Sequence, residues 1–174
     1  DGEAWGIGIK IASLNNIISN TFIDTIIGGT GIGRGTGIDV SGSSNNNLIY
    51  NTNISNTQTF DIRITAISVN NTFLNVSYDY SKESVASGSS LYRKWYYRAH
   101  TTNTTGQDVA NATVHAYNVT GDLVLNITAN NSGWTNITTL VDYYNIGGTI
   151  TYQSNYIAAA NNQSFEITNT TLWD

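Results

Sequence analysis

Apolar and polar residues alternate with a period of two along most of this chain. Residues 5–11 read Trp-Gly-Ile-Gly-Ile-Lys-Ile, and residues 112–117 read Ala-Thr-Val-His-Ala-Tyr. This period places successive side chains on opposite faces of a β-strand. Proline, which interrupts central strands, is absent from the sequence. The pattern therefore predicts an all-β protein.

The same alternation predicts the core of the second half of the chain. Two apolar alternating segments are separated there by a Gly-Asp pair at positions 121 and 122, which is typical of a hairpin. The side chains expected to face inward are Ala112, Val114 and Ala116 on one strand and Leu123, Leu125 and Ile127 on its partner.

A repeat is present in the first half of the chain. Segments 15–24, 46–55 and 70–79 each begin with paired asparagines and continue with apolar residues, another asparagine and a short alternating strand. The spacing between successive segments suits one rung of a parallel β-helix, with asparagine at the corners. The first spacing is longer than the second, and the extra residues are expected in a lateral loop formed by the glycine-rich segment 28–37.

The paired-asparagine segments, and residues 70–78 above all, resemble the closing rungs of right-handed parallel β-helix repeat proteins common on archaeal cell surfaces. Residues 109–114, 119–123 and 130–135 resemble motifs of the carboxypeptidase-regulatory-like (prealbumin-like) β-sandwich. The resemblance implies a short right-handed parallel β-helix over residues 1–79, a linker over 80–90 and an antiparallel β-sandwich over 91–174.

Asn-x-Ser/Thr sequons are dense, and they indicate an exported, N-glycosylated protein. The chain has eleven of them, and pairing by chance among its asparagine, serine and threonine residues would give about half as many. Asn118 and Asn130, both next to predicted turns, are the favoured acceptors. The sequon asparagines are Asn53, Asn70, Asn75, Asn103, Asn111, Asn118, Asn126, Asn130, Asn136, Asn162 and Asn169.

Composition narrows the class of function. Hydrophobic residues make up 40% of the chain, enough for a packed core, whereas charged residues make up only 11% and the net charge is −5. That charge disfavours nucleic acid as a partner, and no apolar run reaches the length of a membrane span. Cysteine is absent, which excludes disulfides and thiol chemistry. The start at Asp1 without a basic and apolar leader is typical of a processed chain or a fragment.

Residues that could carry chemistry are few. His100 and His115 have no metal-ligand spacing around them, so no metal or cofactor is expected. The 28–37 loop lacks the Gly-Lys-Ser/Thr ending of a phosphate-binding loop. Some β-helix proteins are polysaccharide lyases or hydrolases that use a lateral charged face, but a solubilised surface explains the charges here better than catalysis. The residues in question are Asp24, Arg34, Asp39, Asp61 and Arg63.

Two further patterns in the second half have a simpler structural explanation. Lys94, Glu166 and Asn169 are spaced suggestively for an intramolecular isopeptide bond, although an outward-facing lysine is the better interpretation. The aromatic segment 92–97 could bind carbohydrate, but packing of its rings is the expected role.

These patterns favour an extracellular structural protein that assembles head to tail with copies of itself into a glycosylated filament or cell-envelope layer. A short β-helix exposes its ends, and the apolar row Trp5, Ile7, Ile9 and Ile11 is equally compatible with a first-rung strand and with a strand donated to a neighbouring subunit. We expect the donated strand, with these four residues as the subunit contact. The alternatives are a carbohydrate-binding adhesin module of a larger surface protein and, third, a polysaccharide-active enzyme. No catalytic residue is assigned.

Overall fold

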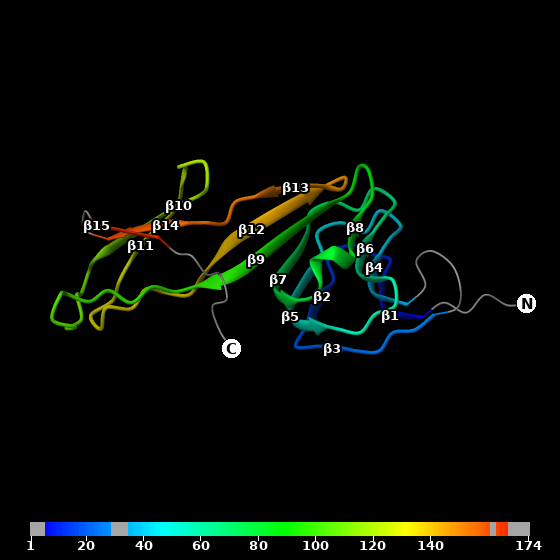
Figure 1. Ribbon diagram of the computed structural model, residues 1–174, viewed down its shortest axis with the longest axis horizontal. Coiled ribbons are helices and arrows are strands. Elements are labelled where there is room, and N and C mark those ends of the chain that lie inside the picture. Colours follow the sequence, from blue (N-terminus) through cyan, green and yellow to red (C-terminus); the bar gives the residue numbers. More distant parts are fainter. Residues whose placement is uncertain (1–5, 29–34, 161–162, 167–174) are drawn as a thin grey trace, which may run out of the picture. The chain divides into compact units, whose positions relative to one another are not determined.

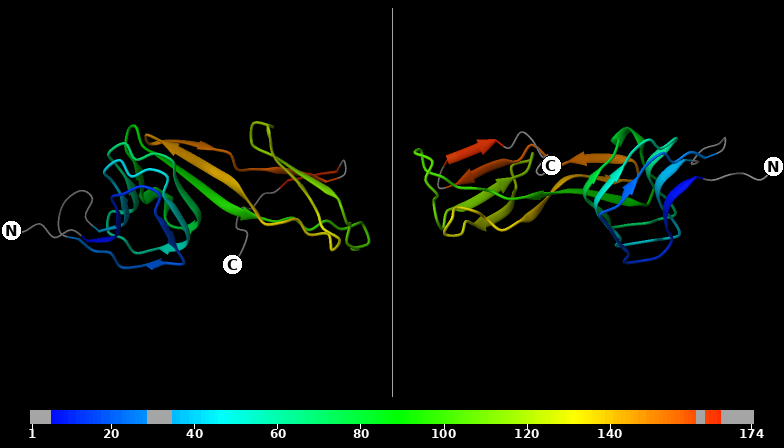
Figure 2. Two further views of the ribbon diagram at one scale, coloured as in Figure 1. Left: turned by 180° about the vertical axis from the view of Figure 1, so that it is seen from behind. Right: turned by 90° about the horizontal axis from the view of Figure 1, so that it is seen from below.

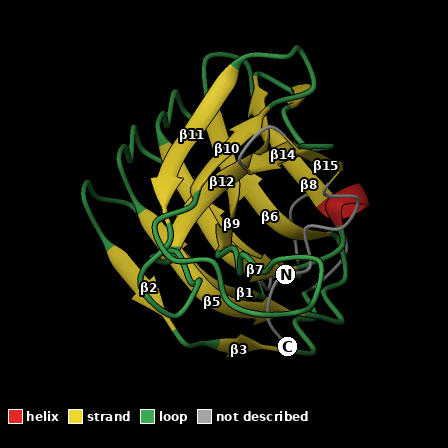
Figure 3. Cartoon of the chain, turned by 90° about the vertical axis from the view of Figure 1, so that its left-hand side faces the viewer, coloured by secondary structure: helices red, strands yellow, loops and turns green. Residues whose placement is uncertain are grey.

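A computed structural model describes residues 6–28, 35–160 and 163–166 (Figure 1). This part of the chain is all-β, and its one helical element is the short 3-10 helix η1 (Tyr80–Lys82) (Figure 3). The strands are β1 (Ile7–Ile11), β2 (Ile17–Ser19), β3 (Phe22–Ile23), β4 (Thr36–Val40), β5 (Leu48–Ile54), β6 (Phe60–Ile64), β7 (Asn71–Ser77), β8 (Glu83–Val85), β9 (Ser90–Tyr97), β10 (Thr113–Tyr117), β11 (Leu123–Thr128), β12 (Thr138–Ile146), β13 (Thr149–Tyr152), β14 (Ile157–Ala160) and β15 (Gln163–Glu166).

The chain divides into two compact units. The first unit comprises residues 1–94 and 144–151, and the second comprises residues 95–143 and 152–174. Residues 80–90, which the sequence analysis assigned to a linker, instead contain η1 and β8 and belong to the first unit. The reason is that β8 continues a sheet begun earlier in the chain, since it pairs in parallel with β6.

In the first unit the chain alternates between two sets of parallel strands (Figure 2). One sheet has the order β1-β4-β6-β8. The other set, β2, β5, β7 and β9, belongs to a sheet of order β13-β12-β9-β7-β5-β2, with β3 also paired to β5. We call each strand of the first sheet, together with the strands that follow it in the second, a repeat. Within the first unit the repeats span residues 7–23, 36–54, 60–77 and 83–94, and the last of them ends inside β9, where the unit ends.

The predicted alignment of the three paired-asparagine segments matches the register of these ladders. Ile17 lies opposite Leu48, and Leu48 lies opposite Thr72. The paired asparagines just before these three residues therefore align as well. The fourth repeat, residues 83–94, was not anticipated because it has no asparagine pair; Leu91 occupies the position opposite Asn71.

Asparagine serves two purposes at the corners of the repeats. Asn20, Asn51 and Asn75 have φ angles of 52°, 50° and 52°, in the left-handed region that asparagine tolerates better than most residues. Their amides also bond to one another: Nδ2 of Asn51 donates to Asn20 Oδ1 (3.3 Å), and Nδ2 of Asn75 donates to Asn51 Oδ1 (3.0 Å). The corner is therefore fixed both by local backbone preference and by contacts between repeats.

Buried side chains of the first unit align in columns along the ladders. Ile38 faces Ile62 in register, Ile49 faces Phe73, and all four are fully buried. In the fourth repeat these columns end in charged residues, because Glu83 lies opposite Ile62 and Arg93 opposite Phe73.

These charged residues are held by partners within the same unit. The Tyr78 hydroxyl donates to a Glu83 oxygen, Nδ2 of Asn145 donates to the other oxygen (2.7 Å), and the Arg93 guanidinium lies 4.8 Å from the Tyr78 ring centre. The fourth repeat thus closes the apolar columns with charged groups that have partners in the same unit.

The second unit contains an antiparallel sheet of order β11-β10-β14-β15, together with parts of β9 and β12. Tyr97, Leu140 and Tyr156 form a core against which Leu125 and Ile127 of β11 pack. The predicted inward row is confirmed: Ala112, just before β10, and Val114 and Ala116 of β10 are 2%, 2% and 0% exposed.

The prediction for Leu123 is wrong, since this side chain is 52% exposed. A register shift between Ala116 and Tyr117 pairs Leu123 with Tyr117, while Leu125 pairs with Ala116. The bulge inserts an extra residue opposite the strand end and turns Leu123 away from the core.

Candidate functional site

The first repeat forms the open end of the parallel stack. β1 and β2 each stand last in their sheet, so among the described strands each has a neighbour on one side only. Ile9 and Ile18 stand in register with Ile38 and Ile49, which are fully buried, yet both are only half-buried themselves. Within the described part of the chain, the end of the stack therefore presents apolar side chains beside unpaired strand edges.

Other large apolar side chains are exposed in the same repeat. Ile17 is 70% exposed and Phe22 is 68% exposed, whereas the residues opposite them in the second repeat are Leu48, which is half-buried, and Asn53, which is polar. Leu14 and Ile27, also in this part of the chain, are exposed too. Four large exposed apolar side chains therefore lie within residues 14–27, in the first repeat or just after it.

The expected donated strand is not observed. β1 pairs in parallel with β4 of its own chain, with Ile9 opposite Ile38 and Ile11 opposite Val40, and Ile11 is only 4% exposed. Ile7 and Ile9 are half-buried in the same pairing, and Trp5 lies outside the described residues. The reason is the register of β1 with β4. It places these isoleucines next to buried apolar residues of the same chain.

Three of the sequons form one recurring hairpin loop with the pattern Asn-x-Ser/Thr-Gly-x, at residues 103–107, 118–122 and 130–134. In each loop the asparagine Oδ1 accepts bonds from the backbone N–H groups two and four residues on and from the Ser/Thr hydroxyl. The glycine of each loop has a positive φ angle (83°, 85° and 74° in chain order), a conformation that glycine adopts more easily than other residues. In these loops the sequon hydroxyl therefore has a structural role, and part of the excess of sequons is a turn pattern.

The three loops differ at the atom to which a sugar would be attached. Nδ2 of Asn118 donates to Gln153 (3.0 Å), and the residue is only 7% exposed. Nδ2 of Asn103 donates to Gln107. Asn130 is exposed, and no acceptor for its Nδ2 is found in the described part of the chain. Asn130 therefore remains a suitable attachment site for an N-glycan, whereas Asn118 is unsuitable.

The other sequon asparagines lie mostly at the surface. Asn75 is half-buried, and its Nδ2 is already bonded to Asn51. Asn162 and Asn169 lie outside the described residues. The exposed ones are Asn53, Asn70, Asn111, Asn126 and Asn136.

Most of the charged residues considered for catalysis have structural partners. Arg63 Nε donates to Asp39 Oδ1 (2.9 Å), and Asp39 is buried. Buried Asp61 accepts bonds from the Thr57 hydroxyl (2.5 Å) and from the backbone N–H of Asp79 (2.8 Å). Donors from Ser55 and, secondly, Asn56 lower the pKa of exposed Asp24. Arg34 lies outside the described residues.

Neither histidine belongs to a metal-binding cluster. His100 Nε2 lies 2.9 Å from Asp108 Oδ1, and the His100 ring stacks on Trp134 with 4.2 Å between ring centres. The His115 ring meets that of Tyr117 edge to face. Within residues 6–28, 35–160 and 163–166, no group of three His, Cys, Asp or Glu residues could hold a metal ion.

The aromatic segment 92–97 is engaged in packing. Tyr97 is 5% exposed, Trp95 Nε1 donates to Asp142 (3.2 Å), and the Tyr92 ring lies 6.1 Å from that of Tyr144. Lys94 stands in register with Leu74 on β7. Its suggested isopeptide partner Asn169 lies outside the described residues.

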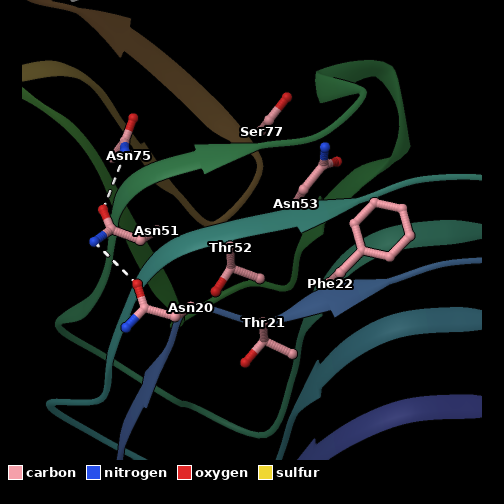
Figure 4. Close-up of a pocket in the computed structure, with 8 residues that line it drawn as sticks. All are labelled: Asn20, Thr21, Phe22, Asn51, Thr52, Asn53, Asn75 and Ser77. Carbon is pink, nitrogen blue, oxygen red and sulfur yellow. Dashed lines mark hydrogen bonds between the residues drawn. The ribbon is translucent and has the colours of Figure 1, made fainter. Parts of the chain in front are cut away.

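A shallow hollow of about 460 Å³ lies over β3, β5 and β7 (Figure 4). Its lining is uncharged and includes one aromatic ring, that of Phe22. The lining residues are Asn20, Thr21, Phe22, Asn51, Thr52, Asn53, Asn75 and Ser77. Sequence reasoning missed this site, because Phe22, Asn53 and Ser77 come together only through the register of the repeats.

Comparison with known proteins gives no match among family models, curated proteins or solved structures. Of the described residues, none forms a helix long and apolar enough to cross a membrane.

Proposed function

We propose that this chain is an extracellular structural protein, a subunit of a glycosylated filament or cell-envelope layer that assembles through its first repeat. In this proposal the first unit is a short right-handed parallel β-helix of the kind found on archaeal cell surfaces. The second unit is a carboxypeptidase-regulatory-like β-sandwich. No catalytic role is proposed.

The observation that carries the proposal is the difference between the two ends of the parallel stack. At the fourth repeat the apolar columns end in Glu83 and Arg93, which have partners in their own unit. At the first repeat the columns end in half-buried Ile9 and Ile18, on strands β1 and β2, which among the described strands have a neighbour on one side only. Such an end favours the addition of a further strand layer, and we assign that layer to a second copy of the chain.

The size of the apolar surface is compatible with a stable joint. Complete burial of a large aliphatic side chain contributes roughly 1.5–3 kcal/mol, so Ile17 and the exposed parts of Ile9 and Ile18 would contribute several kcal/mol together. Main-chain hydrogen bonds along β1 and β2 add to this, and the loss of rotational and translational freedom opposes it. A contact between two open ends gives a dimer, whereas contact with another surface of the neighbour gives a chain.

The test replaces Ile18 with arginine and measures assembly of the full chain. Ile18→Arg places a charge on the open end, so we expect the oligomers of the wild-type protein to dissociate. The control is Ile137→Arg, because Ile137 is an exposed isoleucine (60%) that lies outside the first repeat. Sedimentation velocity and electron microscopy give the readout, and circular dichroism checks that both variants are folded.

Two outcomes would contradict the proposal. The first is a wild-type protein that stays monomeric over the whole accessible concentration range, because the proposal requires self-assembly. Assembly that is lost equally in Ile18→Arg and Ile137→Arg does not depend on the first repeat.

A further inference from the structure

Three outward side chains form a row across neighbouring parallel strands. Phe22 of β3 lies in register with Asn53 of β5, and Asn53 lies in register with Ser77 of β7. All three are exposed, and Phe22 is 68% exposed. Adjacent strands are about 4.8 Å apart, so the row places an aromatic ring, an amide and a hydroxyl at short, regular intervals.

The polar members of this row are available for binding. Within the described part of the chain, the side chains of Asn53 and Ser77 make no hydrogen bond, whereas the neighbouring amides of Asn20, Asn51 and Asn75 are bonded to one another. That bonded row fixes one side of the hollow (Figure 4). The free groups therefore stand on a rigid support, which lowers the entropy lost on binding.

We propose that this hollow is a binding site for a neutral saccharide. A pyranose ring has an apolar C–H face that packs on an aromatic ring, and it has hydroxyl groups that both donate and accept hydrogen bonds. Phe22 supplies the aromatic face, while the Asn53 amide and the Ser77 hydroxyl supply donors and acceptors. The lining contains no charged residue, which favours a neutral sugar over a uronic acid or a phosphorylated ligand.

The saccharide can come from two sources, and both would pack on the Phe22 ring and lie near the Ser77 hydroxyl. A free or cell-bound oligosaccharide can occupy the hollow directly. Alternatively, an N-glycan attached to sequon residue Asn53 places its first ring beside Phe22, because these two residues are direct neighbours across the ladder. The inference does not depend on self-assembly, since all its contacts lie within one chain.

The first arm of the test uses the full chain made in a host that attaches no N-glycans. Neutral oligosaccharides of glucose, mannose, xylose and N-acetylglucosamine are titrated into it, and the amide signals are followed by NMR. We expect saturable shifts of the Asn53 side-chain amide and of residues around Phe22, with at least a tenfold loss of affinity in Phe22→Ala. Tyr80→Ala is the control, because Tyr80 is an aromatic residue of similar exposure (63%) outside the hollow.

The second arm uses protein from a host that attaches N-glycans. Glycopeptide mass spectrometry measures occupancy at Asn53, and NOE contacts between sugar protons and the Phe22 ring report packing of the attached glycan. Shifts in the first arm identify a free ligand, and contacts in the second identify the attached one; either result supports the site. The proposal is overturned if free sugars leave the hollow unperturbed and no glycan proton contacts Phe22.

Discussion

The Asn47 side chain connects three repeats through one buried amide. Its Oδ1 accepts bonds from the backbone N–H and the Nδ2 of Asn16 (both 2.8 Å), and its Nδ2 donates to Asn71 Oδ1 (2.8 Å). The row stops at Asn71, whose own Nδ2 is buried with no partner among the described residues, because Leu91 stands next in register.

Replacing Asn47 with alanine should therefore destabilise the first unit strongly. The change leaves buried donors and acceptors unpaired on both sides, at about 1–3 kcal/mol for each buried group. Asn53→Ala, on the same strand but exposed, should change the free energy of unfolding by less than about 0.5 kcal/mol. Urea denaturation compares the two, and equal effects would show that the amide row contributes no stability.

Glycan occupancy should differ between two copies of the same loop. In a host that attaches N-glycans we expect Asn130 to be modified and Asn118 to be unmodified, since a sugar on Asn118 would replace its bond to Gln153 and could not fit at a buried position. Intact mass above 18.9 kDa and glycopeptide mapping measure this. Modification of Asn118 in folded protein would contradict the prediction.

Tyr156 should make the second unit sensitive to alkali. Burial, and secondly the nearby Asp142 carboxylate, raises its pKa from 10.0 to about 12. A raised pKa in the folded state means that stability is complete below pH 10 and falls as the pH rises from 10 to 12, because the unfolded chain loses its proton first. The slope is up to about 1.4 kcal/mol per pH unit.

Tyr156→Phe tests this assignment. The variant loses the bond from the hydroxyl to the Val141 carbonyl, so it should be about 1 kcal/mol less stable at neutral pH. The stability of the variant should also depend less on pH above pH 10. Thermal melts at several pH values compare it with Tyr80→Phe, an exposed control, and an unchanged alkaline slope would assign the sensitivity to other groups.

At the scale of the element, β11 offers two adjacent positions with opposite environments. Leu125 packs against the core of the second unit, whereas Val124 is 44% exposed. Leu125→Asp should cost about 3 kcal/mol or more, because it places an unpaired charge in an apolar environment, and Val124→Asp should be close to neutral. Chemical denaturation measures both, and a tolerated Leu125→Asp would mean that the register of β11 is different.

Elements of the fold could be predicted from the sequence where the residues of a single strand carry a characteristic pattern. The period of two identifies the buried row Ala112, Val114 and Ala116, and the asparagine pairs give the register of β5 and β7. The bulge that exposes Leu123 could not be predicted in this way. The pairing of residues next to a hairpin turn depends on the geometry of the turn, which the alternating pattern does not specify.

The fourth repeat and the hollow were not recognisable for a related reason. Both depend on which residues a ladder brings together. Glu83 and Arg93 break the apolar pattern of their columns, so the sequence around them is typical of a linker. Phe22 and Asn53 are neighbours across a ladder but distant in the sequence, and neither residue alone indicates a binding site.

For the whole molecule, assembly through the first repeat should be nearly independent of ionic strength. The residues assigned to the contact are Ile9, Ile17 and Ile18, which carry no charge, and the net charge of the chain is only −5. Sulfate should strengthen the contact, as it does for apolar burial in general. Sedimentation at increasing sodium chloride concentrations checks this, and dissociation by salt would indicate an ionic contact elsewhere.

The common register of the middle repeats also restricts how such a gene can change in length. β4 aligns with β6, and β5 with β7, at one and the same offset along the sequence, as the pairs Ile38 with Ile62 and Ile49 with Phe73 show. A tandem duplication of one segment of that length would add a layer of about 4.8 Å and leave both ends unchanged. A duplication of any other length inside a strand would break the asparagine row and the apolar columns together. Variants of this protein are therefore expected to differ in length by whole repeats, or by insertions confined to the loop between β3 and β4.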